Sequence, residues 1–241
     1  MRPLVVRSLV GHRGRFGVGA PLYSRLFLVL AVLLVALAGG CERAGWKTTE
    51  VDRKAIEVDG AHMTLHTGTV GMGDHQSEAS YVLIDAKNPT DKDVAVTLGG
   101  SLLDKDNAPV GTLDRQSLRI PKGGTRTFAL VDSEQEPRPT ATGATIEVTS
   151  AVVLDYPEQI TMTDIHEYPD GDRIVIKGYI TNTVDREGKG LAIATFYDRD
   201  GRPMKRPSTV YRLGREARRG IQFVGPSGSV RATLFVGDIV Y

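Results

Sequence analysis

The chain has 241 residues, of which 30 are basic and 29 acidic, so its formal net charge at neutral pH is +1. This balance argues against nucleic acid as a partner, because nucleic-acid-binding domains concentrate basic residues. The single cysteine excludes an intrachain disulfide and a cysteine-based zinc site. The folded part must therefore be stabilised by packed apolar cores.

The amino-terminal segment has the layout of an export signal. Five arginines and no acidic residue precede an apolar run over Leu26–Leu37, and small residues then lead to Cys41. This pattern resembles the signal peptide of bacterial lipoproteins, although Ala38 stands where that family usually has a larger aliphatic residue. The resemblance implies that residues 1–40 are removed and that Cys41 is lipidated. An uncleaved membrane helix is the alternative, but the run is shorter than the ~20 apolar residues that a spanning helix needs.

A lipid on Cys41 predicts where the protein resides. Each buried methylene contributes about 0.8 kcal/mol, so two or three acyl chains would hold the protein on a bilayer essentially permanently. We therefore expect a location in the bacterial cell envelope, with the membrane as a partner through the lipid anchor. Glu42, directly after the cysteine, resembles the enterobacterial pattern for outer-membrane sorting and favours the outer over the inner membrane. Residues 41–55 are predicted to be the lipidated cysteine and a polar linker.

The rest of the chain has the composition of β-strands. It is rich in Val, Ile and Thr, is interrupted by Gly and Pro, and lacks long helical apolar spacing. Turn residues separate two series of strand-like segments. The first series covers 61–66, 81–86, 94–103, 113–120, 125–131 and 145–154, and the second covers 159–164, 173–181, 191–197, 209–213, 220–224 and 229–241.

The two series repeat one pattern. Asn88 and Asn182 lie in similar turns, as do Asp104 and Asp198, and both pairs are separated by 94 residues. A period near one hundred residues is typical of a duplicated domain and too long for a solenoid repeat. Short strands at this turn spacing indicate an immunoglobulin-like sandwich. We therefore predict an all-β fold class with two tandem immunoglobulin-like β-sandwich domains, over residues 56–156 and 157–241.

A short aromatic motif lies in the second half of the chain. After Ile174–Asn182 comes Ala194–Gly201, in which Phe196, Tyr197 and Asp198 are consecutive. These residues resemble the FxLYD-type immunoglobulin-like domain of bacterial envelope proteins, with an alanine in place of the family's first phenylalanine. The first half matches the motif less well. The resemblance implies an accessory module without catalysis.

The motif also allows a prediction from strand geometry. Side chains alternate along a strand, so Ala194 and Phe196 should face one side while Thr195 and Tyr197 face the other. Asp198–Gly201 should turn the chain, because Asp bonds to the backbone ahead and Gly accepts a positive φ. A calcium loop is the alternative, but it needs a later bidentate glutamate, and none lies at the required distance.

A cluster of histidine and methionine is the best candidate for a metal site. His62, His66, Met72 and His75 lie within fourteen residues, and imidazole with thioether ligands suits copper. On a strand, His62 and His66 would share a face about 13 Å apart, so only one of them could join the site. The alternative is that Met63 packs in the core and the histidines are solvated. Copper is the only cofactor that the sequence suggests.

A basic run near the carboxyl end is a candidate partner-binding surface. Arg212, Arg215, Arg218 and Arg219 occupy a predicted strand–turn–strand unit. Together they could bind lipid headgroups, an acidic protein or a polyanionic envelope polymer. A screened, solvated surface is the alternative, since arginine side chains usually lie in solvent.

No catalytic motif can be read in the chain. It contains neither a Gly-x-Ser-x-Gly elbow nor a His-Glu-x-x-His helix motif. We therefore predict a lipid-anchored envelope protein that is not an enzyme and that binds or scaffolds another envelope protein. The competing hypothesis is a lipoprotein that binds or delivers copper through the histidine and methionine cluster.

Overall fold

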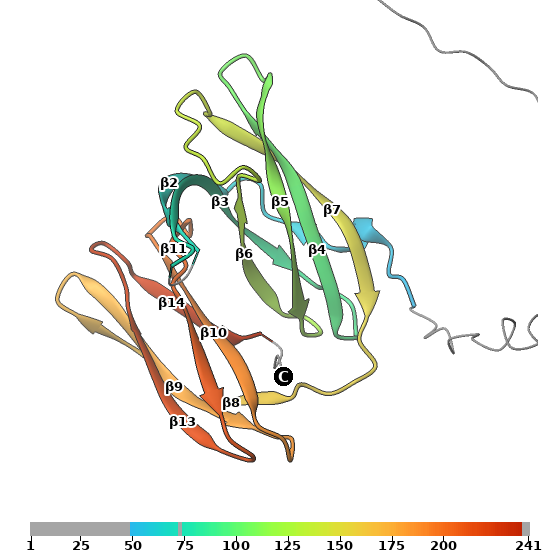
Figure 1. Ribbon diagram of the computed structural model, residues 1–241, viewed down its shortest axis with the longest axis vertical. Coiled ribbons are helices and arrows are strands. Elements are labelled where there is room, and N and C mark those ends of the chain that lie inside the picture. The colour runs from blue at the N-terminus through green and yellow to red at the C-terminus, as the bar shows by residue number, and fades with distance from the viewer. Residues whose placement is uncertain (1–48, 72–73, 238–241) are drawn as a thin grey trace, which may run out of the picture. The chain divides into compact units, whose positions relative to one another are not determined.

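Antiparallel β-strands make up nearly all of the regular structure in the computed structural model, which describes residues 49–71 and 74–237 (Figure 1). Within these described residues, the one helical element is a single 3-10 turn, η1 (Arg53–Ala55). None of the helices in the described ranges has the length and apolarity needed to cross a membrane. The predicted signal peptide, Cys41 and Met72 lie outside the described residues. The all-β prediction is confirmed.

The first sandwich contains two antiparallel sheets. In one sheet β3 is central, with β1 and β2 on one edge and β6 on the other. In the other sheet β4 lies between β5 and β7. The strand bounds are β1 (Glu57–Val58), β2 (Thr64–Val70), β3 (Ser77–Lys87), β4 (Val94–Leu103), β5 (Pro109–Ile120), β6 (Thr125–Val131) and β7 (Gly143–Val153).

The second sandwich repeats this pairing. β9 lies between β8 and β13, and β10 lies between β14 and an edge made of β11 and β12. Since both halves place their strands in two sheets in the same order, each is an immunoglobulin-like sandwich. The strand bounds are β8 (Ile160–Asp170), β9 (Arg173–Asn182), β10 (Gly188–Tyr197), β11 (Pro203–Lys205), β12 (Ser208–Leu213), β13 (Arg218–Val224) and β14 (Arg231–Val236).

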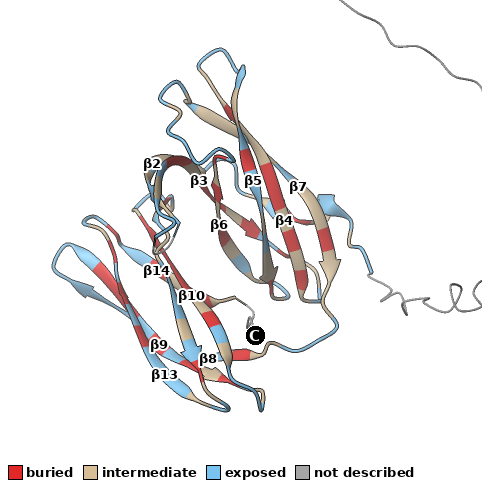
Figure 2. Cartoon of the chain, viewed as in Figure 1, coloured by how far each residue is buried: buried red, intermediate tan, exposed pale blue. Residues whose placement is uncertain are grey.

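Each sandwich encloses a cluster of buried apolar side chains. The first cluster includes Ile84, Leu98 and Phe128, and the second includes Ile176 and Phe196. Figure 2 shows buried residues spaced along β4 and β10, whereas β8 is exposed along most of its length. Both clusters belong to one compact unit of the chain, Thr48–Tyr241. The domain boundaries at residues 56, 156 and 157 stay a prediction.

The repeat extends to the hydrogen bonds of one buried asparagine in each sandwich. Asn88 donates to the carbonyl oxygens of Lys92 and Ile120, at 2.7 and 3.0 Å. Asn182 donates to the carbonyls of Arg186 and Gly214, at 2.7 and 2.9 Å, which are the positions 94 residues further along. Each Oδ1 accepts from the backbone N–H two residues ahead. The same amide therefore ties the end of the central strand to a neighbouring turn in both sandwiches.

The two aspartate turns are equivalent as well. Asp104 Oδ1 accepts from the N–H groups of Asp106 and Ala108, and Asp198 Oδ1 accepts from those of Asp200 and Arg202. A residue with positive φ follows in each turn, Asn107 at 61° and Gly201 at 80°. The predicted turn chemistry is confirmed, and the carboxylates that suggested calcium serve as caps for backbone N–H groups.

Some strand limits differ from the prediction. The first strand was expected at 61–66, but β2 begins at Thr64, because the Asp59 carboxylate accepts from the N–H of His62 and holds the preceding residues in a turn. β8 continues to Asp170 after a bulge near Asp164, whose φ is 52°. The last predicted strand, 229–241, is β14 over Arg231–Val236, and residues 238–241 lie outside the described part.

We expect Asn88→Ala and Asn182→Ala each to lower the free energy of unfolding by about 1–3 kcal/mol, because each removes a buried amide that donates to two carbonyl oxygens. Urea denaturation measures the change. Gln222→Ala, at an exposed position of β13, is the matched control and should leave the free energy of unfolding nearly unchanged. A loss no larger than that of the control would show that these amides do not hold the turns.

Candidate functional site

Tyr197 of the aromatic motif connects the two sandwiches. As predicted, β10 alternates: Ala194 and Phe196 belong to the core of the second sandwich, and Tyr197 points the other way. The Tyr197 hydroxyl lies 2.8 Å from Thr127 Oγ1 and donates to Asp85 Oδ1 at 3.3 Å. Both partners belong to the first sandwich, so the motif tyrosine forms a buried joint between the two.

Two arginines complete this joint around Phe235 of β14. The Cζ atoms of Arg126 and Arg206 lie 4.8 and 5.7 Å from the centre of the Phe235 ring. Arg206 Nε donates to the carbonyl oxygen of Thr127 at 2.7 Å. A guanidinium over an aromatic face is attracted by the ring quadrupole, more strongly when water is excluded. The joint therefore combines apolar, cation–π and hydrogen-bonding contacts.

Burial shifts the protonation equilibria of the joint. Desolvation raises the pKa of the Asp85 carboxyl, although the hydrogen bonds from Thr127 and Tyr197 act in the opposite direction. Desolvation also lowers the pKa of Arg206 to about 10. Nη2 of Arg206 has no hydrogen-bond partner among the described residues. The joint thus buries polar groups whose desolvation is unfavourable. They stabilise the joint only while their hydrogen-bond partners stay in place.

A second contact holds the segment between the sandwiches. Arg119 donates to the carbonyl oxygen of Tyr156 at 2.6 Å and to Asp93 Oδ2 at 2.9 Å. Its Cζ atom also lies 5.1 Å from the centre of the Tyr156 ring. Tyr156 is therefore fixed against β5 and is not a free linker residue.

We expect the stability of the wild type to fall, relative to Asp85→Asn, as the pH rises from about 4 to 7. A carboxyl whose folded pKa is raised favours folding at pH values below the ordinary pKa near 4, and this contribution is lost as the pH rises through the raised value. Urea unfolding of both proteins at pH 4 and pH 7 measures the difference. Asp114→Asn, an exposed carboxyl on β5, is the matched control. A variant whose pH dependence matches the wild type would contradict the shift.

Two of the predicted metal ligands, His62 and His66, have other partners in the structure. The His62 Nδ1 atom lies 2.8 Å from Asp59 Oδ2 in the turn before β2, so His62 does not share a strand face with His66 as expected. His66 Nε2 lies 2.8 Å from Thr64 Oγ1, and its ring stacks on Tyr81 with centroids 5.2 Å apart. Burial lowers the pKa of His66.

The remaining members of this cluster are split between described and undescribed residues. His75 is exposed, and Met72 lies outside the described ranges. Met63 packs against the first core. Within residues 49–71 and 74–237, no group of three or more His, Cys, Asp or Glu is placed to hold a metal ion. Copper binding stays a prediction.

We expect wild type and a His66→Ala, Met72→Ala double variant to bind Cu(I) and Cu(II) with the same affinity, because His66 is already bonded and stacked at the joint. Calorimetric or competition titration measures this. A wild type that binds copper at least about tenfold more tightly than the double variant would instead support the copper hypothesis.

The four arginines of the predicted basic surface have different neighbours. Arg215 Nη1 lies 3.5 Å from Asp185 Oδ1, and the Arg219 guanidinium lies 4.9 Å from the Tyr211 ring centre. Arg212 is exposed on β12, in a different sheet from Arg218 and Arg219 on β13. The role of the four arginines in partner binding stays a prediction.

An exposed aromatic face, which sequence reasoning missed, lies on the sheet β13–β9–β8. Tyr168 and Tyr179 are 38% and 43% exposed. Lys177 Nζ lies 5.4 Å from the Tyr168 ring centre, and the Arg218 guanidinium lies 3.9 Å from that of Tyr179. A hollow of about 480 Å³ opens beside Tyr179. The alternation of Lys177 and Tyr179 along the strand was the available signal, because it places a tyrosine on the face away from the core.

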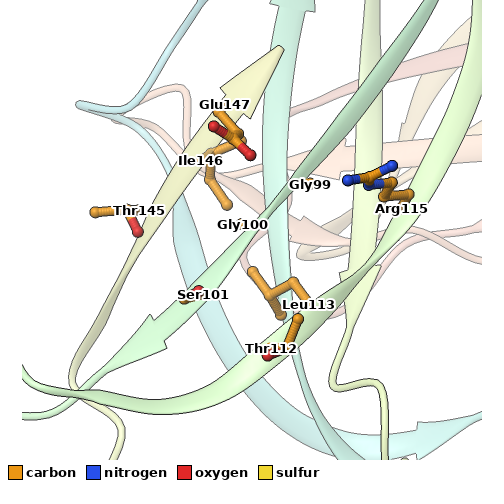
Figure 3. A pocket seen from close by; sticks show the side chains of 9 residues that line it. All are labelled: Gly99, Gly100, Ser101, Thr112, Leu113, Arg115, Thr145, Ile146 and Glu147. Atoms are coloured by element: carbon orange, nitrogen blue, oxygen red, sulfur yellow. The ribbon is translucent and has the colours of Figure 1, made fainter. Parts of the chain in front are cut away.

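The outer face of the sheet β5–β4–β7 carries a groove of about 360 Å³ (Figure 3). Gly99 and Gly100 lie along the groove at an irregularity in the β4–β5 pairing. A Cβ atom on Gly100 would lie 2.0 Å from the Thr145 carbonyl oxygen, so only glycine fits there. The side chains of Arg115 and Glu147 flank the groove, which is otherwise lined by glycine, serine and threonine together with Leu113 and Ile146.

Comparisons with known proteins leave the family open. No protein-family model matches the chain, and no curated protein matches it. A DUF1425 family member from Shewanella sp. pv-4 is similar in structure with a TM-score of 0.32, at 13% identity over 36% of this chain and 84% of that chain. Red sea bream transglutaminase matches with a TM-score of 0.23, at 11% identity over 71% of this chain and 28% of its own. Scores this low carry no functional argument, so the fold assignment rests on the strand pairing of the chain itself.

Proposed function

We propose that this protein is a lipid-anchored, non-catalytic module of the bacterial cell envelope that binds or scaffolds other proteins there. The observation that carries the proposal is the exposed aromatic face of β13–β9–β8, where Tyr168, Tyr179 and Val224 are all exposed. Exposed apolar side chains gathered on one face mark interaction sites, and tyrosine is enriched in them.

The joint between the sandwiches supports a scaffolding role. Tyr197 bonds to Asp85 and Thr127, so the two sandwiches present their outer faces in a defined relation. A binding module that keeps its faces in one arrangement loses less conformational entropy when a partner docks. The finer assignment of the second sandwich as an FxLYD-type domain belongs to this proposal and is supported by Phe196, Tyr197 and Asp198.

The lipid anchor is the second part of the proposal. The arginine-rich start, the apolar run and the small residues before Cys41 support lipidation at that thiol. The partners are then the membrane, through the anchor, and an envelope protein. Glu42 favours the outer membrane. Confinement to a bilayer raises the local concentration of such partners, which lets a weak sheet-face contact be effective.

We expect Cys41→Ala to abolish incorporation of radiolabelled palmitate and to release the protein from carbonate-washed membranes, because the thioether anchor cannot form. Immunoblotting of membrane and supernatant fractions measures the release, with the wild type as the reference. A variant that stays with the washed membranes would overturn the lipid anchor and favour an uncleaved membrane helix.

A further inference from the structure

A crevice beside the joint is walled by both sandwiches. On one side it is lined by the outer face of β3 and β6, which carries Tyr81 and Ala129. On the other side it is lined by the end of β11 and the turn that follows, which carry Lys205 and Arg206. Its volume of about 450 Å³ is in the range of sites for small organic molecules. A molecule held in it would therefore contact both sandwiches.

The charged side chains that line the crevice are basic. Lys205 and Arg206 are among its lining residues, and none of the described residues that line it is an aspartate or a glutamate. Gln76, Tyr81 and Gln116 also line it, and each carries a group that can donate a hydrogen bond. A hollow with charge of one sign and low-dielectric walls concentrates ions of the opposite sign. The crevice therefore favours an anion.

Arg206 has no carboxylate partner in the described part of the chain. Its Nε atom donates to the carbonyl oxygen of Thr127, and its Cζ atom lies 5.7 Å from the centre of the Phe235 ring, so both of these neighbours are uncharged. Its Nη2 atom is buried and has no hydrogen-bond partner among the described residues. Burying an unpaired charge is strongly unfavourable. An anion in the crevice would supply the interaction that Arg206 does not receive from the described chain.

The duplication indicates that the fold does not need these two cations. β11 pairs with β10 in the same register in which the equivalent part of β5 pairs with β4, 94 residues earlier. At the positions of Lys205 and Arg206, the first sandwich has Gly111 and Thr112. Neutral residues thus serve at this edge of the first sandwich. The cations of the second sandwich therefore point to a contact outside its own fold.

An apolar floor continues from the cations along β6. Thr127, Ala129 and Val131 alternate with core residues and so share the outer face of this strand. Arg206 is bonded at Thr127, and Ala129 and Val131 line the crevice beyond it. A second hollow, of about 530 Å³, is also lined by Ala129 and Val131 and extends along the first sandwich to Arg115. The space therefore fits an elongated molecule with a charged head at Arg206 and an apolar body over Ala129 and Val131.

We propose that the crevice binds a free organic anion of medium length, with its carboxylate or phosphate held by Lys205 and Arg206 and its apolar body over Ala129 and Val131. A volume of about 450 Å³ suits a molecule with one short chain and not a membrane phospholipid with two long ones. The site goes beyond the proposed function, since it uses neither the aromatic face nor Cys41. Because the ligand contacts both sandwiches, its binding stabilises the arrangement in which the joint holds them.

Titration calorimetry on the full-length lipidated protein in phosphatidylcholine nanodiscs tests the site, with empty nanodiscs as the blank and octanoate as the probe. Octanoate should bind at least about tenfold more tightly than butyrate, because its additional methylenes are removed from water over Ala129 and Val131. Octanol, which has a chain of the same length without the charge, should not bind above the blank.

Substitutions separate the head of the site from its floor. Lys205→Gln should lower the octanoate affinity by about tenfold, because it removes a charge at the head from an exposed side chain. Lys177→Gln, at an exposed position of β9, is the matched control and should leave the affinity unchanged. Ala129→Leu should reduce the octanoate affinity to that of butyrate, because the larger side chain fills the floor. Its affinity for butyrate should equal that of the wild type, which a loss of folding would not produce.

Absence of octanoate binding above the blank would overturn the proposal, as would equal binding of octanol. An effect of Lys177→Gln as large as that of Lys205→Gln would also overturn it, because the attraction would then be general to the surface. So would Lys205-dependent binding to vesicles of anionic phospholipid without octanoate binding, which would make the occupant a lipid headgroup. Each of these outcomes leaves the proposed binding role and the anchor untouched, because neither Tyr179 nor Cys41 takes part in the site.

Discussion

The buried hydroxyl of Tyr197 is the contact on which the arrangement of this protein depends. It brings a donor to a carboxylate and a hydroxyl that the other sandwich has already removed from water. A buried polar group without a partner destabilises a structure by more than a satisfied one stabilises it. The joint therefore penalises any other docking of the two sandwiches, since Asp85, Thr127 and Arg206 would all lose a partner. Specificity is its main contribution, because burying these groups offsets much of their mutual attraction.

The residues that hold the turns are the same in both copies of the duplicated sandwich. The residues on the outer faces, which make contacts outside the sandwich, differ between the copies. Asn88 and Asn182 make the same backbone bonds, and Asp104 and Asp198 cap the same turn. These groups act within one sandwich, so the same constraint holds in both copies. The outer faces have no such constraint and differ at equivalent positions, with Asp85 in one copy and Tyr179 in the other. One pair of faces is closed within the chain, and the other pair is open.

The histidines show what the local sequence pattern could not predict. Spacing alone placed His62 on a strand with His66, but the carboxylate of Asp59, three residues earlier, accepts from the His62 N–H and keeps it in a turn. His66 does lie on β2, yet its partners are Thr64 and Tyr81 at the edge of the joint. A sequence window shows which ligand types are near one another along the chain. It does not show which contacts those side chains have already made.

By itself, the sequence determined the fold class, the duplication and the turns, because these follow from local physics. Strand alternation has a period of two, an aspartate cap acts over two to four residues, and the repeat offset of 94 is visible in the order of residues. The alternation also determined that Phe196 and Tyr197 point to opposite faces. Only the tertiary structure decided what covers the face to which Tyr197 points. The alternation of side chains along a strand assigns each one to a side of the sheet. Whether that side meets solvent or another sandwich depends on packing between residues more than a hundred positions apart, such as Asp85 and Tyr197.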